Sequence, residues 1–215
     1  SRVDVSEPNP IILAQRKAIF NGVKLTKLND SNPTSHGLAP QCLSGCYTAD
    51  PRGPKEIRDI LSNFINKRDN RTEKSVPPKL NPDQLYVLSS TSQAYAWLMM
   101  LLCDAGDAVM GPTPGYPLIE SIARLQCVNA IPYPLHYDGS WTIDIARVRE
   151  LLEDASLRIK ALVLINPNNP TGSYVKPEER EILLQLCRDN GVAIIADEVF
   201  YEYSLESFAG NALSL

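Results

Sequence analysis

Hydrophobic residues between positions 85 and 197 gather in short runs that are apolar without interruption. A strand with one face in water alternates apolar and polar residues, so an unbroken apolar run predicts a strand buried on both faces. Segments with helical periodicity separate the runs, as in a mainly parallel sheet whose connections are helices. The predicted strands are 85–89, 108–111, 128–133, 160–165 and 192–197, and the predicted helices between them are 92–103, 117–126, 144–153 and 177–190. The expected fold class is α/β, a three-layer sandwich in which helices cover both faces of the sheet.

The N-terminal part of the chain lacks this alternation. One helix is predicted over residues 11–22 and another over residues 54–67. The segment 28–54 is rich in proline, glycine and serine, which predicts a long irregular loop, and loops of that length are usually functional or disordered. Two parts are therefore expected: an N-terminal helix and irregular arm over residues 1–54 that covers a site, and a large domain over residues 55–215.

The charge balance and composition exclude several classes of protein. The chain has 21 lysines and arginines against 25 aspartates and glutamates, and it has no basic block, so a nucleic-acid partner is not expected. The longest apolar stretch, residues 95–103, is too short to span a bilayer. The N-terminal sequence SRVDVSEPNP lacks the pattern of a secretory signal. The sequence thus predicts a cytoplasmic protein with no membrane segment and no nucleic-acid partner.

The cysteines raise the question of a metal site. Cys42 and Cys46 are close in sequence, but no second cysteine pair follows, and only His36 and His136 are available to complete a set of ligands. Reduced, packed thiols are therefore the expectation, and no metal is predicted. The same expectation holds for the remaining cysteines, which are Cys103, Cys127 and Cys187.

Polar residues that follow the predicted strands are the first candidates for a site, because α/β sheets bind ligands at the carboxyl ends of their parallel strands. The sequence SSTSQA (89–94) opens a helix with hydroxyl groups and free backbone N–H groups, which together suit a phosphate. Neither G-K-[ST] nor GxGxxG is present, so neither a nucleotide P-loop nor a dinucleotide-binding fingerprint is predicted. The alternative is that a serine or threonine here only caps the helix.

Three further strand ends carry an aromatic ring, an amide and a carboxylate. Prolines on both sides hold Tyr116 in the turn GPTPGYP (111–117), where its ring stacks on a flat ligand or serves as an ordinary buried tyrosine. The turn NPNNPTG (166–172), which includes Asn169, is more specified than a plain turn requires. Asp197 ends an apolar strand, where a carboxylate is costly without a positive partner. A protonated ring nitrogen would be such a partner, and a structural salt bridge is the alternative.

Together these groups match the needs of a phosphorylated pyridine such as pyridoxal phosphate. The phosphate would be held at the helix start, the ring stacked on the tyrosine, and the ring oxygen hydrogen-bonded to the amide. The carboxylate would keep the ring nitrogen protonated, so that the ring can accept electrons. No single strand end indicates this cofactor, but their joint occurrence predicts it.

The chain resembles the class I/II aminotransferases, which are fold-type I pyridoxal-phosphate enzymes, over most of its length. The motifs that carry the resemblance are YTADPRGPKEIR (47–58), SSTSQA (89–94), GDAVMGPTPGYP (106–117), NPNNPTG (166–172) and ADEVF (196–200). The most specific signal is NPNNPTG followed by a strand that ends in Asp-Glu. The resemblance implies the large domain of that fold, truncated before its C-terminal domain.

The resemblance also implies roles for individual residues. It implies that the cofactor phosphate is held by Ser90, Thr91 and Ser92. It further implies that Tyr116 stacks on the ring, that Asn169 hydrogen-bonds the ring hydroxyl and that Asp197 pairs with the pyridine nitrogen. Tyr47 matches the tyrosine that reaches the phosphate in the neighbouring subunit's site, which implies a homodimer with shared sites.

The sequence departs from the family pattern at three points. Phe200 stands where a tyrosine usually donates to the ring hydroxyl, so either the amide of the NPNNPTG turn does that work alone or Tyr201 substitutes. Ser31 stands where a glycine is common near the substrate. No lysine follows Lys176, so the resemblance implies that the Schiff-base lysine lies beyond Leu215, together with the domain that grips the substrate carboxylate.

The implied activity is transfer of an amino group from an amino acid to a 2-oxo acid, by a ping-pong route through pyridoxamine phosphate. Two alternatives stay open. A pyridoxal-phosphate-dependent lyase acting on an amino acid uses the same scaffold, and aminotransferase-like domains also serve as non-catalytic effector-binding parts of regulators. A regulator is expected to carry a DNA-binding module before Ser1, and this sequence contains none.

Overall fold

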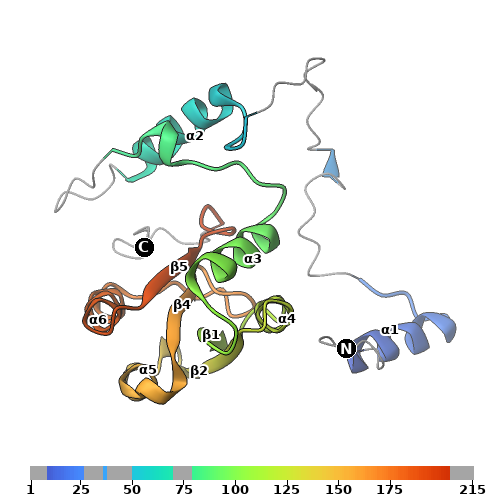
Figure 1. Ribbon diagram of the computed structural model, residues 1–215. Coiled ribbons are helices and arrows are strands. Elements are labelled where there is room, and N and C mark those ends of the chain that lie inside the picture. Colours follow the sequence, from blue (N-terminus) through green and yellow to red (C-terminus); the bar gives the residue numbers. More distant parts are fainter. Residues whose placement is uncertain (1–8, 27–35, 38–49, 70–78, 204–215) are drawn as a thin grey trace. The chain divides into compact units, whose positions relative to one another are not determined.

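The computed structural model describes residues 9–26, 36–37, 50–69 and 79–203 (Figure 1). The chain divides into two compact units, Ser1–Ala49 and Asp50–Leu215. Several positions singled out in the sequence lie outside the described residues, namely Ser31, Cys42, Cys46, Tyr47 and Leu215.

Helix α1 (Pro10–Phe20) belongs to the first unit and lies close to the helix predicted over residues 11–22. The Asn9 side chain caps it by accepting a hydrogen bond from the Ile11 N–H at 2.9 Å. Pro10 occupies the first turn, where no backbone N–H is needed. None of the residues of α1 is buried, so capping and helix propensity define this helix rather than packing against the described residues.

A five-stranded sheet in the order β3-β2-β1-β4-β5 forms the centre of the second unit. The strands are β1 (Ala108–Thr113), β2 (Asn129–Tyr137), β3 (Trp141–Ile143), β4 (Ile159–Ile165) and β5 (Ala193–Asp197). β1 pairs in parallel with β2 and with β4, β4 pairs in parallel with β5, and β3 runs antiparallel to β2. The four parallel strands therefore bring their carboxyl ends to one edge of the sheet.

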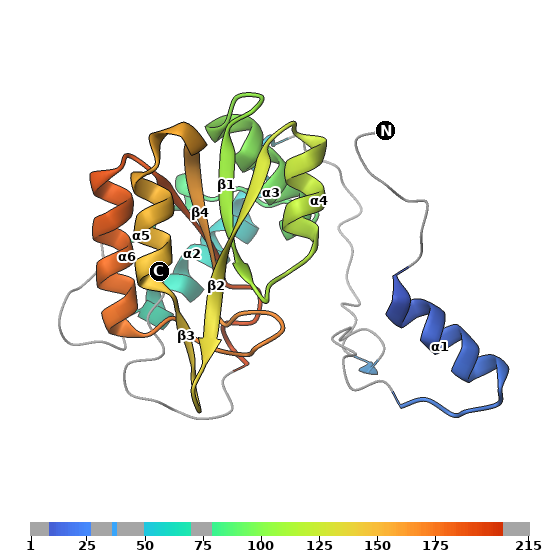
Figure 2. The same ribbon diagram turned by 90° about the horizontal axis from the view of Figure 1, so that it is seen from below.

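Helices cover both faces of this sheet (Figures 1 and 2). One face carries α3 (Thr91–Leu102) and α4 (Leu118–Leu125), and the other carries α5 (Ile145–Glu153) and α6 (Pro177–Asp189). Successive side chains of a strand point to opposite faces, so on β4 Val163 packs with α3 and α4 while Leu162 packs with α5 and α6. This strand is apolar at successive positions because both of its faces are buried. The predicted α/β three-layer sandwich with a mainly parallel sheet is confirmed.

Helix α2 (Lys55–Asp69) is joined by one buried arginine to a short 3-10 helix (Pro82–Gln84) that comes just before α3 in the sequence. The Arg58 guanidinium donates to the carboxylates of Asp50 at 3.0 Å and Asp83 at 3.1 Å. It also donates to two backbone carbonyl oxygens, each at 3.0 Å. A buried guanidinium needs acceptors for most of its donors, and this cluster supplies them. The cluster thereby fixes the start of α2 against the segment that leads to the sheet.

The prediction of a strand over residues 85–89 is wrong. Leu85 has extended backbone angles, and the Val87 N–H donates to the Arg52 carbonyl at 2.8 Å, but no strand pairs with this segment in the described ranges. An apolar extended segment becomes a strand only where a neighbour completes the ladder of hydrogen bonds. β3 was not predicted, because three residues are too few to reveal a period.

Leu162 provides a test of the core on the α5–α6 face, because it is fully buried on β4, which has a strand on each side. Leu162→Ala should lower the free energy of unfolding by about 2–5 kcal/mol, since it removes buried methyl groups and leaves a cavity. Denaturant unfolding of the full-length protein measures this loss. Ile182→Ala, at a partly exposed position of α6, is the control and should change the free energy by about 0.5 kcal/mol or less. Equal losses in the two variants would contradict this account of the core.

Candidate functional site

The start of α3 offers unused hydrogen-bond donors. The Ser90 hydroxyl oxygen accepts from the Gln93 N–H at 3.2 Å, so Ser90 caps the helix. The hydroxyls and backbone N–H groups of Thr91 and Ser92 make no hydrogen bond to any described residue. Capping and anion binding therefore need not compete here, because the cap uses only an oxygen lone pair of Ser90 and leaves the donors of Thr91 and Ser92 unused. The first N–H groups of a helix and its positive dipole end favour an anion such as a phosphate.

Asp197 is the last residue of β5 and lies directly opposite Ile165, the last residue of β4. Its carboxylate is half-buried, and both oxygens accept hydrogen bonds. Oδ1 accepts from the Val199 N–H at 3.1 Å, and Oδ2 accepts from the Tyr95 hydroxyl at 2.7 Å. Asp197 forms no ion pair with any residue that the structure describes, so the structural salt bridge weighed from the sequence is not found there. A cationic partner for this carboxylate would have to come from elsewhere.

Tyr95 is a site residue that sequence reasoning missed. It lies on α3, and its side chain is 2% exposed. Burial, and after it the hydrogen bond to Asp197, raises the pKa of the Tyr95 hydroxyl well above its ordinary value. The sequence did contain a signal, because a tyrosine in the apolar stretch 94–102 needs a partner for its hydroxyl. It did not show that the partner would be Asp197.

The three asparagines of the NPNNPTG turn differ in their hydrogen-bond partners. The Asn166 side-chain oxygen accepts from the Val175 N–H at 2.9 Å. The Asn168 side-chain amide donates to the Pro114 carbonyl at 3.1 Å and to the Thr171 hydroxyl at 2.9 Å. Both of these asparagines are buried. Asn169 is only partly buried, and its side chain makes no hydrogen bond to the described residues, so its amide is free to meet a ligand.

Glycine ends the NPNNPTG turn for a conformational reason. Gly172 has φ of +69°, in the left-handed region that side chains disfavour. In this conformation its N–H donates to the Asn168 carbonyl at 2.7 Å, while the Asn168 N–H donates to the Ser173 carbonyl at 2.8 Å. The turn closes on itself through these bonds, and Asn169 lies at its outer part.

Tyr116 lies in a second turn that is joined to the first. The hydrogen bond from Asn168 to the Pro114 carbonyl connects the turn after β1 with the turn after β4. Gly115 is required between them, because a Cβ at this position would come inside contact distance of the Pro112 carbonyl oxygen. Tyr116 is half-buried: it packs against the core on the α3–α4 face and also lines a hollow of about 360 Å³ beside β2. Tyr116 therefore contributes to the core and also remains partly accessible to a ligand.

The residues after β5 close the same edge of the sheet. Tyr201 is buried and lies edge-on to Tyr174, with ring centroids 6.5 Å apart. The Tyr174 hydroxyl donates to the Tyr201 carbonyl at 2.9 Å. Phe200, at the position where the family usually has a tyrosine, lies edge-on to Tyr203 at 5.8 Å. These contacts join the segment after β5 to the segment that follows the NPNNPTG turn.

In the described part of the chain, no group of three or more histidine, cysteine, aspartate or glutamate side chains is placed to hold a metal ion. None of its helices combines the length and the apolar character needed to cross a membrane.

A comparison with known sequences matches one family profile, described as aminotransferase class I and II, to residues 47–214. Mitochondrial alanine aminotransferase 2 of Arabidopsis thaliana is 30% identical to this chain over 167 residues. That alignment covers 76% of this chain and 29% of the plant protein, so the chain spans less than a third of this relative.

Solved structures show the same fold. An alanine aminotransferase from Pyrococcus furiosus superposes with a TM-score of 0.76 at 24% identity, covering 95% of this chain and 51% of that one. A pyridoxal-phosphate-bound C–S lyase from Staphylococcus hominis gives a TM-score of 0.61 at 25% identity, covering 71% of this chain and 37% of that one. The fold is that of the fold-type I enzymes, of which the chain represents a part. Since a single family profile matches residues 47–214, this chain belongs to the class I and II aminotransferases.

Proposed function

We propose that the protein to which this chain belongs is a pyridoxal-phosphate-dependent aminotransferase that moves an amino group between an amino acid and a 2-oxo acid. The observation that carries the proposal is the Asp197 carboxylate, which ends β5 with no cationic partner among the described residues. Membership of the class I and II aminotransferases supports it. The pyridinium nitrogen of the cofactor is a cation of the kind that this carboxylate lacks.

The described residues fit the phosphate of this cofactor. A phosphate carries several acceptor oxygens and a negative charge, and the unused donors of Thr91 and Ser92 lie at the positive end of α3. Ser90 uses an oxygen lone pair to cap the helix and keeps its O–H for donation. Holding the phosphate at this helix start would anchor one end of the cofactor.

The described residues also fit the ring. When bound, pyridoxal phosphate supplies a ring that takes up the electron pair released from the substrate. Asp197 would hold a proton at the ring nitrogen, and two of the four lone-pair positions of its carboxylate remain open for that contact. The Asn169 amide would donate to the ring hydroxyl, and the accessible part of Tyr116 would stack on the ring. The role of Tyr201 in place of Phe200 stays a prediction.

Amino transfer is favoured over the lyase alternative. The plant relative is named as an aminotransferase, and the archaeal aminotransferase matches more of this chain than the C–S lyase does. These names also support catalysis over an effector-binding role in a regulator. Alanine is the first amino donor to test, because the plant relative is named as an alanine aminotransferase.

The homodimer and the compartment are part of the proposal. Tyr47 would reach the cofactor phosphate in the neighbouring subunit's site, so that each site would use two chains. Cys103, Cys127 and Cys187 are free thiols, which fits a reducing compartment such as the cytoplasm. The mitochondrial matrix is also reducing, and the plant relative is named as mitochondrial.

The role of Asp197 can be tested by substitution in the full-length protein. Asp197→Ala should reduce transamination by at least about 10²–10³-fold, because the ring nitrogen would lose the charge that keeps it protonated. Circular dichroism checks that the fold is kept, and Asp189→Ala, at the exposed end of α6, is the matched control. Retained turnover in a folded Asp197→Ala protein would refute the assignment.

The shared site can be tested by mixing subunits. Tyr47→Phe and Asp197→Ala proteins should each be weak as homodimers. A mixed dimer should contain one site with both lesions and one site with neither, so activity should recover toward half of the wild-type value. If heterodimers form without any recovery, Tyr47 does not serve the neighbouring site.

The position of the Schiff-base lysine can be tested by chemical trapping. Borohydride reduction of the cofactor-loaded full-length protein, followed by peptide mass mapping, should place the pyridoxyl group on a lysine beyond Leu215. Lys160 lies near the start of β4, at the edge of the sheet opposite the candidate site. Lys176 immediately precedes α6, and its Nζ donates to the Ser140 hydroxyl at 3.0 Å. A stoichiometric adduct on either of these lysines would show that the site is misplaced.

A further inference from the structure

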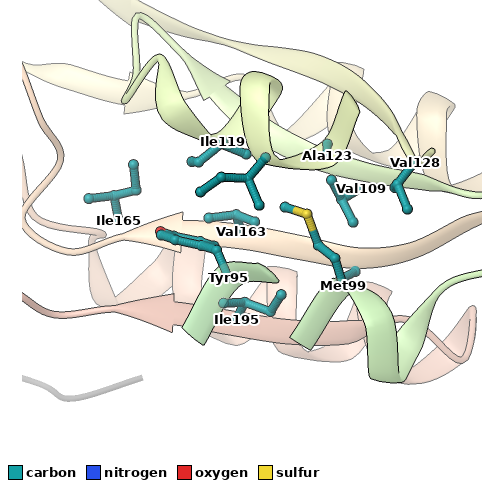
Figure 3. Close-up of a cluster of buried hydrophobic side chains, with 11 residues drawn as sticks. Tyr95, Met99, Val109, Ile119, Ala123, Val128, Val163, Ile165 and Ile195 are labelled. Carbon is teal, nitrogen blue, oxygen red and sulfur yellow. The ribbon is translucent and has the colours of Figure 1, made fainter. Parts of the chain in front are cut away.

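Tyr95 connects the candidate phosphate site to the hydrophobic core. Thr91 and Tyr95 are four residues apart on α3 and therefore lie on the same face of the helix. The Tyr95 ring packs in the core with Met99 and Val163 (Figure 3). In Figure 3 its hydroxyl end points toward Ile165, the last residue of β4. A residue anchored in the core thus carries its polar group to the edge where the parallel strands end.

The Asp197 carboxylate is held from two directions. The Tyr95 hydroxyl donates to Oδ2 at 2.7 Å, the usual distance for a strong O–H···O bond, and the Val199 N–H donates to Oδ1 at 3.1 Å. Donation to an ionised acceptor is stronger than donation to a neutral one. With one donor on each oxygen, rotation of the carboxylate about its Cβ–Cγ bond is restrained. Without Tyr95, the described residues would leave only the Val199 N–H to resist that rotation.

Tyr95 can act only as a donor toward Asp197. Burial in the core, followed by the hydrogen bond to Asp197, raises the pKa of its hydroxyl far above the physiological range. The neutral hydroxyl is therefore favoured, and it donates to the carboxylate. Because its ring is almost completely buried, the direction from which it approaches Asp197 is set by the packing of α3 on the sheet.

We propose that Tyr95 is a positioning residue: its hydroxyl holds the Asp197 carboxylate in the orientation that meets the ring nitrogen of pyridoxal phosphate. The inference rests on the proposed function, because it assumes that Asp197 faces that nitrogen. A hydrogen-bonded ion pair weakens steeply when donor and acceptor are misaligned, so a freely turning carboxylate would bind the ring nitrogen less well. The effect of Tyr95 should therefore be confined to ligands that have a ring nitrogen.

The test compares two cofactors on the apo form of the full-length protein. One is pyridoxal 5′-phosphate, and the other is its 1-deaza analogue, in which a C–H group replaces the ring nitrogen. The ratio of their dissociation constants measures the preference for the nitrogen independently of catalysis. Tyr95→Phe should reduce the wild-type preference by about tenfold, the size expected for losing one hydrogen bond to a charged group.

Tyr133→Phe is the matched control. Tyr133 is also a buried tyrosine, and its hydroxyl donates to the Val163 carbonyl at 2.9 Å instead of to Asp197. Its loss should lower stability as the loss of the Tyr95 hydroxyl does, but it should leave the preference unchanged. Asp197→Asn should abolish the preference, and adding Tyr95→Phe to it should have no further effect on the preference.

The outcomes separate the inference from the proposed function. If Tyr95→Phe keeps the wild-type preference for the compound with a ring nitrogen, the positioning role is overturned. The proposed function still stands in that case, provided that the wild type binds pyridoxal 5′-phosphate normally. A stronger preference would also overturn the positioning role, because the hydroxyl would then act mainly by withdrawing charge from the carboxylate. A wild type that binds neither compound would overturn the proposed function and this inference together. If Tyr95→Phe does not fold, Tyr95→Met supplies the same comparison, since methionine adapts to irregular core space.

Discussion

The site depends on one constraint: a carboxylate at the end of an apolar strand must be hydrogen-bonded or paired. Asp197 meets that constraint through its own following turn, by way of Val199, and through Tyr95, which lies 102 positions earlier in the sequence. Because the Tyr95 ring is also part of the core, the carboxylate depends on the packing of α3 against the sheet. The start of that same helix carries the unused donors that suit a phosphate, so one rigid element relates the two ends of the proposed ligand.

Hydrogen bonds from buried side chains also hold the turns that follow β1 and β4. Asn166 and Asn168 are buried, and their side chains hydrogen-bond to groups of the protein itself. Asn168 also donates to the Pro114 carbonyl, in the turn that contains Tyr116. Asn169, between Asn168 and Pro170, keeps its amide free among the described residues. The buried asparagines thus stiffen the turn, and the partly buried Asn169 keeps an amide that could meet a ligand. A site built in this way loses little conformational entropy when a ligand binds, because its turns are already ordered.

The fold was largely predictable from the sequence, whereas the contacts within the site were predictable only in part. Unbroken apolar runs separated by helices indicated a covered parallel sheet, because burial on both faces leaves that pattern. The same pattern could not show that residues 85–89 lack a partner strand in the described part of the chain, since hydrophobicity reports burial and not pairing. Asp197 was found because a charge at the end of an apolar strand is anomalous in itself. Tyr95 was missed because its stretch of α3 was judged only by its apolar character.

The roles proposed for the described residues concern the binding of the cofactor and not the choice of reaction. In the proposed arrangement a proton held at the ring nitrogen makes the ring a better electron acceptor, and the phosphate contacts anchor the cofactor. Both requirements are the same for amino transfer and for a lyase. The chain superposes on both an aminotransferase and a C–S lyase, as expected if this part of the fold serves the cofactor in either reaction. The bond that breaks depends on how the substrate is held against the ring, and no described residue has been assigned that task. If Asp197 meets the ring nitrogen as proposed, substitutions at Asp197 or Tyr95 should weaken amino transfer and lyase chemistry alike.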